Sequence, residues 1–283
     1  MGSVEIPNFD SVDRTRFSDI TWVPEIGSTN TALLDRARKG GSEGEVIIAD
    51  LQTQGRGRRG RTWTAPPGTS LMMSILLRPP PGTLSPDNAS LITSALAISV
   101  LTAVEEITNI QLEVKWPNDL VVDSPDPILG SGDPGYRKVA GILTETMIQQ
   151  NEIEAMVVGI GINTGWGQVP PELQLTATSL DVLAGSTVHR TQLAQKLLEN
   201  FETEYAALLE PSGKENLLLR LREYSATLGK QVLVHLNEEG ETKPIKGQAI
   251  NIDESGRLLV ELDNGDIQAV SVADVEHLRL DAR

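Results

Sequence analysis

The sequence predicts an α+β protein with a small, separate β domain at its carboxyl end. Up to about residue 228, segments typical of buried strands are interspersed with segments typical of long helices. From Gly229 onward, short strand-like segments alternate with turns such as Asn264-Gly265, which is typical of a small barrel or sandwich. We therefore expect two domains, residues 1–227 and residues 228–283.

Helices are expected where capping residues precede long segments with helical apolar spacing. Ser28 or Thr29 can cap the first helix, which Gly40 ends. Ser85 followed by Pro86 is typical of the start of a long helix. The expected ranges are 28–39, 85–107, 192–209 with Thr191 as its cap, and 214–228.

Strands are expected where short apolar runs are bounded by turn residues. In the first domain the expected strands are 45–50, 70–77, 112–115, 119–122, 139–147 and 153–160. In the second domain they are 231–236, 245–252, 258–262 and 267–272. The segment 124–137 is rich in Pro, Gly and Asp and should be an exposed loop, whereas residues 1–20 should be peripheral.

The composition excludes several classes of protein. The formal net charge of −15 repels nucleic-acid phosphates unless a local basic surface overrides it. The absence of cysteine excludes disulfides, thiolate metal sites and cysteine nucleophiles. Residues 1–10 lack the apolar core of a secretory signal, and the apolar run 91–104 is broken by hydroxyl residues. We therefore expect a cytoplasmic protein that contacts neither membranes nor nucleic acids.

The segment 54–63 carries four arginines within six residues of this acidic chain. Glycines at 55, 57 and 60 let the backbone approach a ligand, and arginines are planar donors that suit phosphate. The segment therefore predicts a loop that is open when empty, because its arginines repel one another, and that closes over a polyphosphate. The alternative is a solvated surface loop. A dinucleotide fingerprint is rejected because residues 62–67 cannot open a helix, and no Walker-type Gly-Lys-Ser/Thr is present.

Four further segments could carry chemistry, each with an ordinary structural alternative. Residues 115–119, Lys-Trp-Pro-Asn-Asp, form either a turn or a site for hydroxyls or a metal. Lys138 enters an apolar strand three residues before Gly141, where a solvated lysine is the alternative. Residues 158–164 run into a glycine-flanked asparagine, which is either a bulge or the wall of a ligand site. Residues 27–30 offer the free N–H groups of a helix start, where plain capping is the alternative. Because all four tryptophans lie in or beside these segments, we expect one aromatic-lined pocket.

Taken together, these segments resemble the biotin–protein ligase (biotin–[acetyl-CoA-carboxylase] ligase) family. Gly-Ser-Thr-Asn, Gly-Arg-Gly-Arg-Arg-Gly-Arg-x-Trp, Lys-Trp-Pro-Asn-Asp, Lys-Val-Ala-Gly-Ile-Leu-x-Glu and Gly-Ile-Gly-Ile-Asn follow in family order over about residues 22–166. The resemblance implies a catalytic domain like that of class II aminoacyl-tRNA synthetases, followed by an SH3-like β-barrel. It implies that biotin is activated with ATP and Mg²⁺ to biotinyl-5′-AMP. Biotin then passes to a lysine of biotin carboxyl carrier protein or an equivalent acceptor domain.

The resemblance also implies roles for individual residues. Biotin would be bound by Ser28, Thr29, Asn30, Gln52, Gly55, Arg56, Trp63, Lys138 and Gly141. The nucleotide would be bound by Arg58, Arg61, Asn118 and Asn163, with Asp119 serving Mg²⁺ and Arg279 near ATP. Lys138, Arg58 and Arg61 would be the catalytic cations. The chemistry needs charge neutralisation and positioning rather than acid–base groups, which suits isolated histidines at 189, 235 and 277.

Two rival functions and two structural questions accompany this resemblance. A lipoate or octanoate ligase or transferase would use the same fold, but Ser28, Thr29 and Gln52 suit a ureido ring better than a dithiolane. A nucleic-acid-binding protein would use the arginine loop directly. Only 26 residues precede Gly27, so we expect a form without the family's N-terminal DNA-binding domain. The sequence does not decide whether the protein is a monomer or a homodimer.

Overall fold

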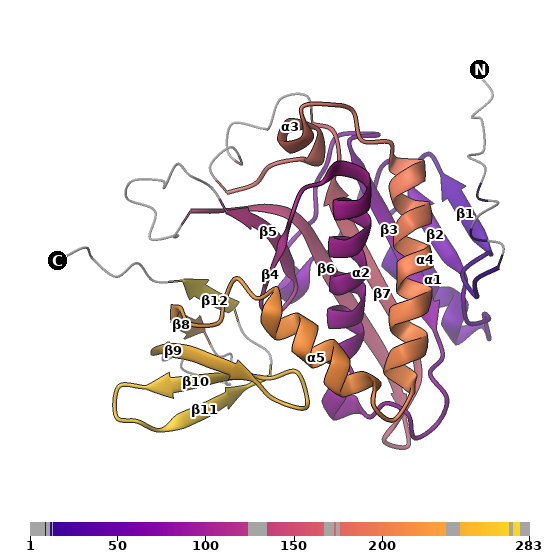
Figure 1. The fold of residues 1–283 in the computed structure, drawn as a ribbon. Coiled ribbons are helices and arrows are strands. Elements are labelled where there is room, and N and C mark those ends of the chain that lie inside the picture. Colours follow the sequence, from indigo (N-terminus) through magenta and orange to yellow (C-terminus); the bar gives the residue numbers. More distant parts are fainter. Residues whose placement is uncertain are drawn as a thin grey trace.

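The computed structural model describes residues 9, 12, 14–123, 135–166, 173, 176–235, 244–271 and 274–277. These residues form a seven-stranded sheet covered by helices and a separate five-stranded sheet (Figure 1). The α+β class expected from the sequence is therefore confirmed. The division of the chain at residue 227 stays a prediction. Of the loop expected over 124–137, residues 124–134 lie outside the described part, as does Arg279, and the expected end is wrong because a strand begins at Tyr136.

The large sheet has the strand order β1-β2-β3-β7-β6-β5-β4, in which β1 and β2 are parallel and the other neighbours antiparallel. Its strands are β1 (Ile20–Val23), β2 (Val46–Ala49), β3 (Ser70–Leu77), β4 (Glu113–Lys115), β5 (Asp119–Asp123), β6 (Tyr136–Gln149) and β7 (Glu152–Asn163). Continuous burial of β2 and β3 matches their continuous apolar runs. The sequence analysis missed β1, a short half-buried edge strand.

Helices cover both faces of this sheet. They are α1 (Thr29–Arg38), α2 (Ser90–Thr108), α3 (Leu180–Ala184), α4 (Arg190–Leu209) and α5 (Gly213–Glu223), with 3₁₀ turns at Arg58–Gly60 and Pro86–Asn88. Neighbouring strand residues point to opposite faces. Ile48 and Ile75 therefore join the core under α2 and α4 (Figure 1), whereas Ile47 and Leu76 pack with Leu33 of α1.

Two helix boundaries differ from the sequence prediction. Thr191 is not the cap of α4, because the helix begins at Arg190 and the His189 carbonyl already accepts the Leu193 N–H. The helix α5 ends at Glu223 instead of residue 228, because the next residues pair with β4. There Val114 N–H donates to the Tyr224 carbonyl, and Ala226 N–H donates to the Val114 carbonyl. A tertiary pairing therefore ends a helix that the local pattern would continue.

By length and apolar composition alone, the segment Pro86–Thr108 could cross a membrane. In the protein, 67% of its apolar window is buried, and its residues belong to the main hydrophobic core. It is therefore the central helix of the fold. The expected start at Ser85 is a capping box with Asn88 followed by a 3₁₀ turn, after which α2 begins at Ser90.

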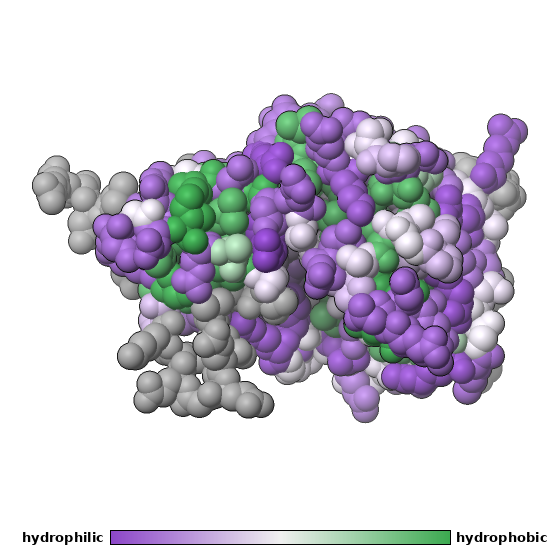
Figure 2. Space-filling model, turned by 90° about the horizontal axis from the view of Figure 1, so that it is seen from below, coloured by the Kyte–Doolittle hydropathy of each residue, from purple (hydrophilic) through white to green (hydrophobic). Residues whose placement is uncertain are grey.

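The small sheet is antiparallel, with the order β11-β10-β9-β8-β12. Its strands are β8 (Gln231–His235), β9 (Ile245–Ile252), β10 (Leu258–Leu262), β11 (Ile267–Val270) and β12 (Asp274–His277), of which β12 was not expected. The turn between β9 and β10 is tied to the first domain, since Trp116 Nε1 donates to the Gly256 carbonyl and Ser90 Oγ to the Ser255 carbonyl. Figure 2 views the molecule from below and shows mostly hydrophilic side chains.

Candidate active site

Three adjoining cavities surround Trp63. The central cavity, of about 570 Å³, is lined by the arginine loop, residues 115–119 and Lys138. The polar pocket, of about 30 Å³, is lined by residues 28–30, Gln52 and Ser74 beside the loop. The third, the aromatic pocket, measures about 550 Å³ and is lined by Asn163 and Trp166 among others. Residues from five of the predicted segments therefore converge on one place.

The polar pocket is built at the amino end of α1. Ser28 caps the helix by accepting the Thr31 N–H at 3.4 Å, and Ile26 bridges to Gln52 in parallel. This pairing places Gln52 beside the start of α1, where its amide oxygen accepts the Thr29 N–H at 2.8 Å. Ser28, Thr29 and Asn30 are each less than 7% exposed. Buried polar groups need partners, so these residues are held in fixed orientations.

The arginine loop folds as a hairpin. Trp63 N–H donates to the Gly55 carbonyl at 3.0 Å, and Gly57 N–H donates to the Arg61 carbonyl at 2.7 Å. A side chain at position 55 would lie 2.2 Å from the Trp63 carbonyl oxygen, which explains the glycine there. At the tip, Arg59 adopts a left-handed φ of 54°. The loop expected to be open is closed in this structure.

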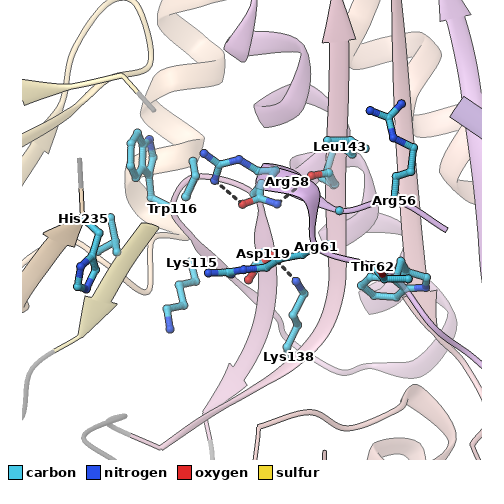
Figure 3. A pocket seen from close by; sticks show the side chains of 17 residues that line it. Arg56, Arg58, Arg61, Thr62, Lys115, Trp116, Asp119, Lys138, Leu143 and His235 are labelled. Atoms are coloured by element: carbon cyan, nitrogen blue, oxygen red, sulfur yellow. Dashed lines mark hydrogen bonds and ion pairs between the residues drawn. The ribbon is translucent and has the colours of Figure 1, made fainter. Parts of the chain in front are cut away.

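The arginines of the hairpin bind separate acceptors, which offsets their mutual repulsion. Arg56 pairs with Glu145 at 2.8 Å, and Arg58 Nη1 donates to Asn118 Oδ1 at 2.9 Å. Figure 3 shows these two side chains extending to opposite sides of the hairpin. Arg59 Nη2 donates to the carbonyl of His235 in the small sheet at 3.1 Å. The hairpin thus bridges β6, the turn before β5 and the second domain.

Lys138 lies at the centre of the site, where an antiparallel strand and an isolated bridge hold its backbone. Its N–H donates to the Thr176 carbonyl, and its carbonyl accepts the Thr178 N–H. Its ammonium pairs with Asp119 at 2.6 Å (Figure 3) and lies 5.5 Å from the Trp63 ring centroid. These contacts position the ammonium group of Lys138 beside the central cavity, whereas a solvated lysine would have no fixed position.

Trp63 rests on a floor of glycines. A side chain at Gly161 would lie 2.3 Å from Trp63 Cε2, and one at Gly141 would lie 3.2 Å from Trp63 Cζ3. The indole therefore fills the space between the polar and aromatic pockets. Its Nε1 is buried and has no hydrogen-bond partner among the described residues. A ring-sized ligand of the polar pocket must displace this side chain, because 30 Å³ holds no more than about two waters.

The single aromatic pocket predicted from the four tryptophans is only partly correct. Trp63 and Trp166 line the aromatic pocket, and Trp116 lines the central cavity. Trp22 lies elsewhere, with its Nε1 donating to Asp50 and Arg190 over its ring. Asn163 reaches the aromatic pocket as expected, although its amide nitrogen is already bonded to the Thr178 carbonyl.

Sequence reasoning missed three residues of the site. Ser74 is a fully buried hydroxyl in an otherwise apolar strand, and that exception was the available signal. Glu145 was quoted within a motif but given no role. His235 contributes its backbone carbonyl, which no sequence pattern could reveal.

The comparisons with known proteins agree with this geometry. A model described as "Biotin/lipoate A/B protein ligase family" matches residues 22–163, and one described as "Biotin protein ligase C terminal domain" matches residues 227–278. The biotin–[acetyl-CoA-carboxylase] ligase of Mycobacterium tuberculosis is 33% identical, over 91% of this chain and 88% of that protein. The bifunctional ligase/repressor BirA of Bacillus subtilis is 31% identical, over 89% and 71% respectively.

A solved structure is also similar over nearly the whole chain. The biotin protein ligase from Aquifex aeolicus, in complex with biotin and ATP, has a TM-score of 0.74 and 28% identity. The match covers 92% of this chain and 100% of that one.

Proposed function

The chain belongs to the biotin/lipoate A/B protein ligase family, and from this premise we propose how its residues carry out the reaction. Its fold is that of the biotin protein ligases, a class II synthetase-like catalytic domain followed by a small C-terminal domain. It is an ATP-dependent biotin–[acetyl-CoA-carboxylase] ligase that forms biotinyl-5′-AMP and transfers biotin to a lysine. The acceptor we propose is the carrier domain of a biotin-dependent carboxylase, and the compartment is the cytoplasm, where ATP is available.

The ureido ring of biotin occupies the polar pocket in this proposal. Ser28 Oγ and the amide nitrogen of Gln52 can donate to the ureido oxygen, while Thr29 Oγ1 can accept from a ureido N–H. The indole of Trp63 leaves its glycine floor, and the acyl chain passes over Gly141 toward Lys138. The support is the position of these groups around one pocket beside the central cavity.

The nucleotide occupies the other two cavities. The aromatic pocket, with Val121, Tyr136 and Trp166 on its walls, suits the adenine ring. The triphosphate lies in the central cavity, where Arg58, Arg61 and other cations gather. Biotin and ATP therefore enter from opposite sides of Trp63, and their reacting ends meet at Lys138.

Asp119 is the residue that would hold Mg²⁺. It is the one carboxylate among the residues lining the central cavity, and no cluster of three metal-ligating side chains occurs among the described residues. Magnesium is usually bound through one or two carboxylates together with substrate phosphates, so a single aspartate beside a triphosphate site fits this ion. Bound Mg²⁺ would neutralise phosphate charge during the transfer.

In the first step, the biotin carboxylate attacks the α-phosphorus and pyrophosphate leaves. Both reactants are anions, so bringing them together requires fixed positive charge. Lys138 supplies it where the central cavity meets the aromatic pocket, and the ion pair with Asp119 holds the ammonium there. Arg58 and Arg61 face the same cavity and stabilise charge on the leaving pyrophosphate.

In the second step, a neutral acceptor lysine attacks the acyl carbon of the mixed anhydride, and AMP leaves with the bonding electron pair. Water competes for the same carbon, so the site must stay covered until the acceptor arrives. The hairpin at residues 55–63 is placed to provide this cover, since its bonds to Glu145 and Asn118 hold it across the cavities.

The observation that carries the proposal is the meeting of the three cavities at Trp63, with Lys138 lining the central cavity and the aromatic pocket. Biotin-dependent exchange of pyrophosphate into ATP tests it, because exchange requires the first step and no acceptor. Wild-type protein should exchange with biotin and not with lipoate. Exchange with lipoate alone would favour the lipoate ligases of the same family, and no exchange with either acid would refute the proposal.

The nucleic-acid reading of the arginine loop has little support from the geometry. The formal net charge of −15 repels the phosphates of a nucleic acid, whereas the arginines face a cavity sized for a small ligand. We propose that this chain region does not bind nucleic acid. Filter binding that is tight and steeply salt-dependent would contradict this proposal.

A further inference from the structure

A continuous chain of hydrogen bonds joins the polar pocket to the arginine hairpin through one carboxylate. Glu145 accepts Asn30 Nδ2 at 3.1 Å and Arg56 Nη1 at 3.0 Å. Ser74 Oγ donates to Asn30 Oδ1 at 2.6 Å and lies 2.6 Å from Thr29 Oγ1. The chain therefore runs from the hairpin to the residue expected to contact the ureido ring.

The sheet creates the space for this chain. Ser74 of β3, Gly159 of β7 and Leu143 of β6 are paired side by side across the sheet. A side chain at Gly159 would lie 1.9 Å from Asn30 Oδ1, so only glycine lets the asparagine lie between the other two residues. There Asn30 Nδ2 also donates to the Leu143 carbonyl at 3.2 Å.

Glu145 determines the direction of every bond in the chain. An ionised carboxylate only accepts, so Asn30 must turn its NH₂ toward it and its oxygen toward Ser74. Ser74 then donates its single proton to Asn30, and its 2.6 Å contact with Thr29 is a hydrogen bond only if Thr29 is the donor. The Thr29 hydroxyl has one proton, so when it donates to Ser74 it cannot also make a full hydrogen bond to Gln52 Oε1, which lies 3.1 Å away.

The result is a threonine hydroxyl that offers lone pairs to the pocket. Such a group binds a ligand N–H and disfavours a ligand acceptor. Both Nδ2 protons of Asn30 are used by Glu145 and Leu143, and its Oδ1 accepts from Ser74, so the asparagine is held in one orientation and orients its neighbours. Ser74 and Asn30 are 0% and 4% exposed, and in such a site an unsatisfied group is costly.

We propose that Glu145 is a positioning residue for substrate specificity, acting through Asn30 and Ser74 to make Thr29 an acceptor for a ureido N–H. This inference rests on the proposed function, because it assigns the ureido ring to the polar pocket. The same carboxylate forms an ion pair with Arg56. Glu145 therefore contacts both the residues that orient Thr29 and the start of the phosphate-binding hairpin.

Two substitutions separate the two arms of this arrangement. Ser74→Ala breaks the chain to Thr29 and leaves the Arg56–Glu145 ion pair intact. Glu145→Gln weakens both arms, because the neutral amide lacks the charge that strengthens the bonds from Asn30 and Arg56 to the carboxylate. Glu154→Gln is the matched control, since Glu154 is an exposed glutamate of the neighbouring strand β7. Circular dichroism and thermal melting confirm that each variant is folded.

Titration calorimetry with biotin, with biotin methylated at either ureido nitrogen, and with ATP gives the readout. Loss of one oriented hydrogen bond should weaken biotin binding roughly tenfold in Ser74→Ala, with the ATP affinity unchanged. The preference for biotin over the weaker-binding methylated isomer should shrink by a similar factor. Glu145→Gln should show both changes and weaker ATP binding, and Glu154→Gln should match wild type.

Three results would overturn the inference. One is biotin binding within twofold of wild type in both Ser74→Ala and Glu145→Gln. Another is an equal loss for biotin and its methylated isomers, which would indicate a general packing effect. The third is a loss in Glu154→Gln as large as that in Glu145→Gln. Failure of the wild-type protein to bind biotin at all would refute the proposed function instead, and the inference with it.

Discussion

Replacing Arg58 with glycine should make the enzyme release its adenylate before the acceptor arrives. In the structure Arg58 holds the hairpin across the central cavity through the bond of its Nη1 to Asn118 Oδ1. Removing this donor costs about 1.5–3 kcal/mol, and the added backbone freedom costs about 0.4–1 kcal/mol. Because Arg58 is only partly buried, we take the lower end, about 2 kcal/mol, which corresponds to roughly thirtyfold more hairpin opening.

Arg59→Gly is the matched control for this prediction. Arg59 is the next residue of the same turn, and its φ of 54° suits glycine. The substitution adds similar backbone freedom, and it removes a bond to the His235 carbonyl in place of the bond to Asn118. It should therefore leave the cover over the central cavity in place.

Bystander labelling measures the escape. Each protein is incubated with biotin, ATP and albumin, and biotin on albumin is quantified by streptavidin binding. Arg58→Gly should label albumin at least tenfold more than wild type and retain biotin-dependent pyrophosphate exchange, because Lys138 remains. Arg59→Gly should stay within about threefold of wild type, since its loss lies outside the cavity. Loss of exchange in Arg58→Gly, or equal labelling by the two variants, would refute the reasoning.

Further predictions concern the catalytic cation, the sheet and the small domain. Lys138→Ala should lower pyrophosphate exchange by about 10²–10³ with an unchanged circular dichroism spectrum, and near-normal exchange would remove Lys138 from the mechanism. Gly159→Ala places a methyl 1.9 Å from Asn30 Oδ1, so melting should show about 1–3 kcal/mol of destabilisation together with weaker biotin binding; an unaffected biotin affinity would contradict the crowding. Burial raises the pKa of Asp253, but bonds from Arg257 and backbone N–H groups outweigh it and hold that pKa below its ordinary value. The resulting stability is present above the unfolded-state pKa and is lost as the pH falls through the lowered value. The melting temperature of Asp253→Asn should therefore change less with pH in the acid range than that of wild type. An identical dependence of melting temperature on pH in the two proteins would refute this.

The chemistry of the site was predictable because it depends on residue types that stand out from their local sequence. Glycines at 55 and 141 stand where the chain passes close to its own backbone or to a reactive side chain. The arginines between residues 56 and 61 are unusual in an acidic chain, and three of them, Arg56, Arg58 and Arg61, line the central cavity. Strands β3, β9 and β10 have the predicted bounds, because uninterrupted or alternating apolar runs between turn residues specify a strand without outside help.

The sequence predictions were wrong where contacts with residues distant in the sequence determine the local structure. The helix pattern after Glu223 is lost to pairing with β4, and Trp22 is drawn to Asp50 rather than to the pocket of the other tryptophans. Local propensity amounts to a few tenths of a kcal/mol per residue, so a tertiary hydrogen bond or a packed ring overrides it.

The sequence by itself determined the fold class, most of the elements and the inventory of charged and polar groups for a two-step acyl transfer. Only the tertiary structure decided which of those groups act together. Glu145 meets Arg56 across 89 residues and Asn30 across 115, and Arg59 meets His235 across 176. These contacts depend on strand order and register, which are settled by burying the apolar side chains of the sheet against its helices. No local run of residues specifies that a single carboxylate will hold both the hairpin and the polar pocket.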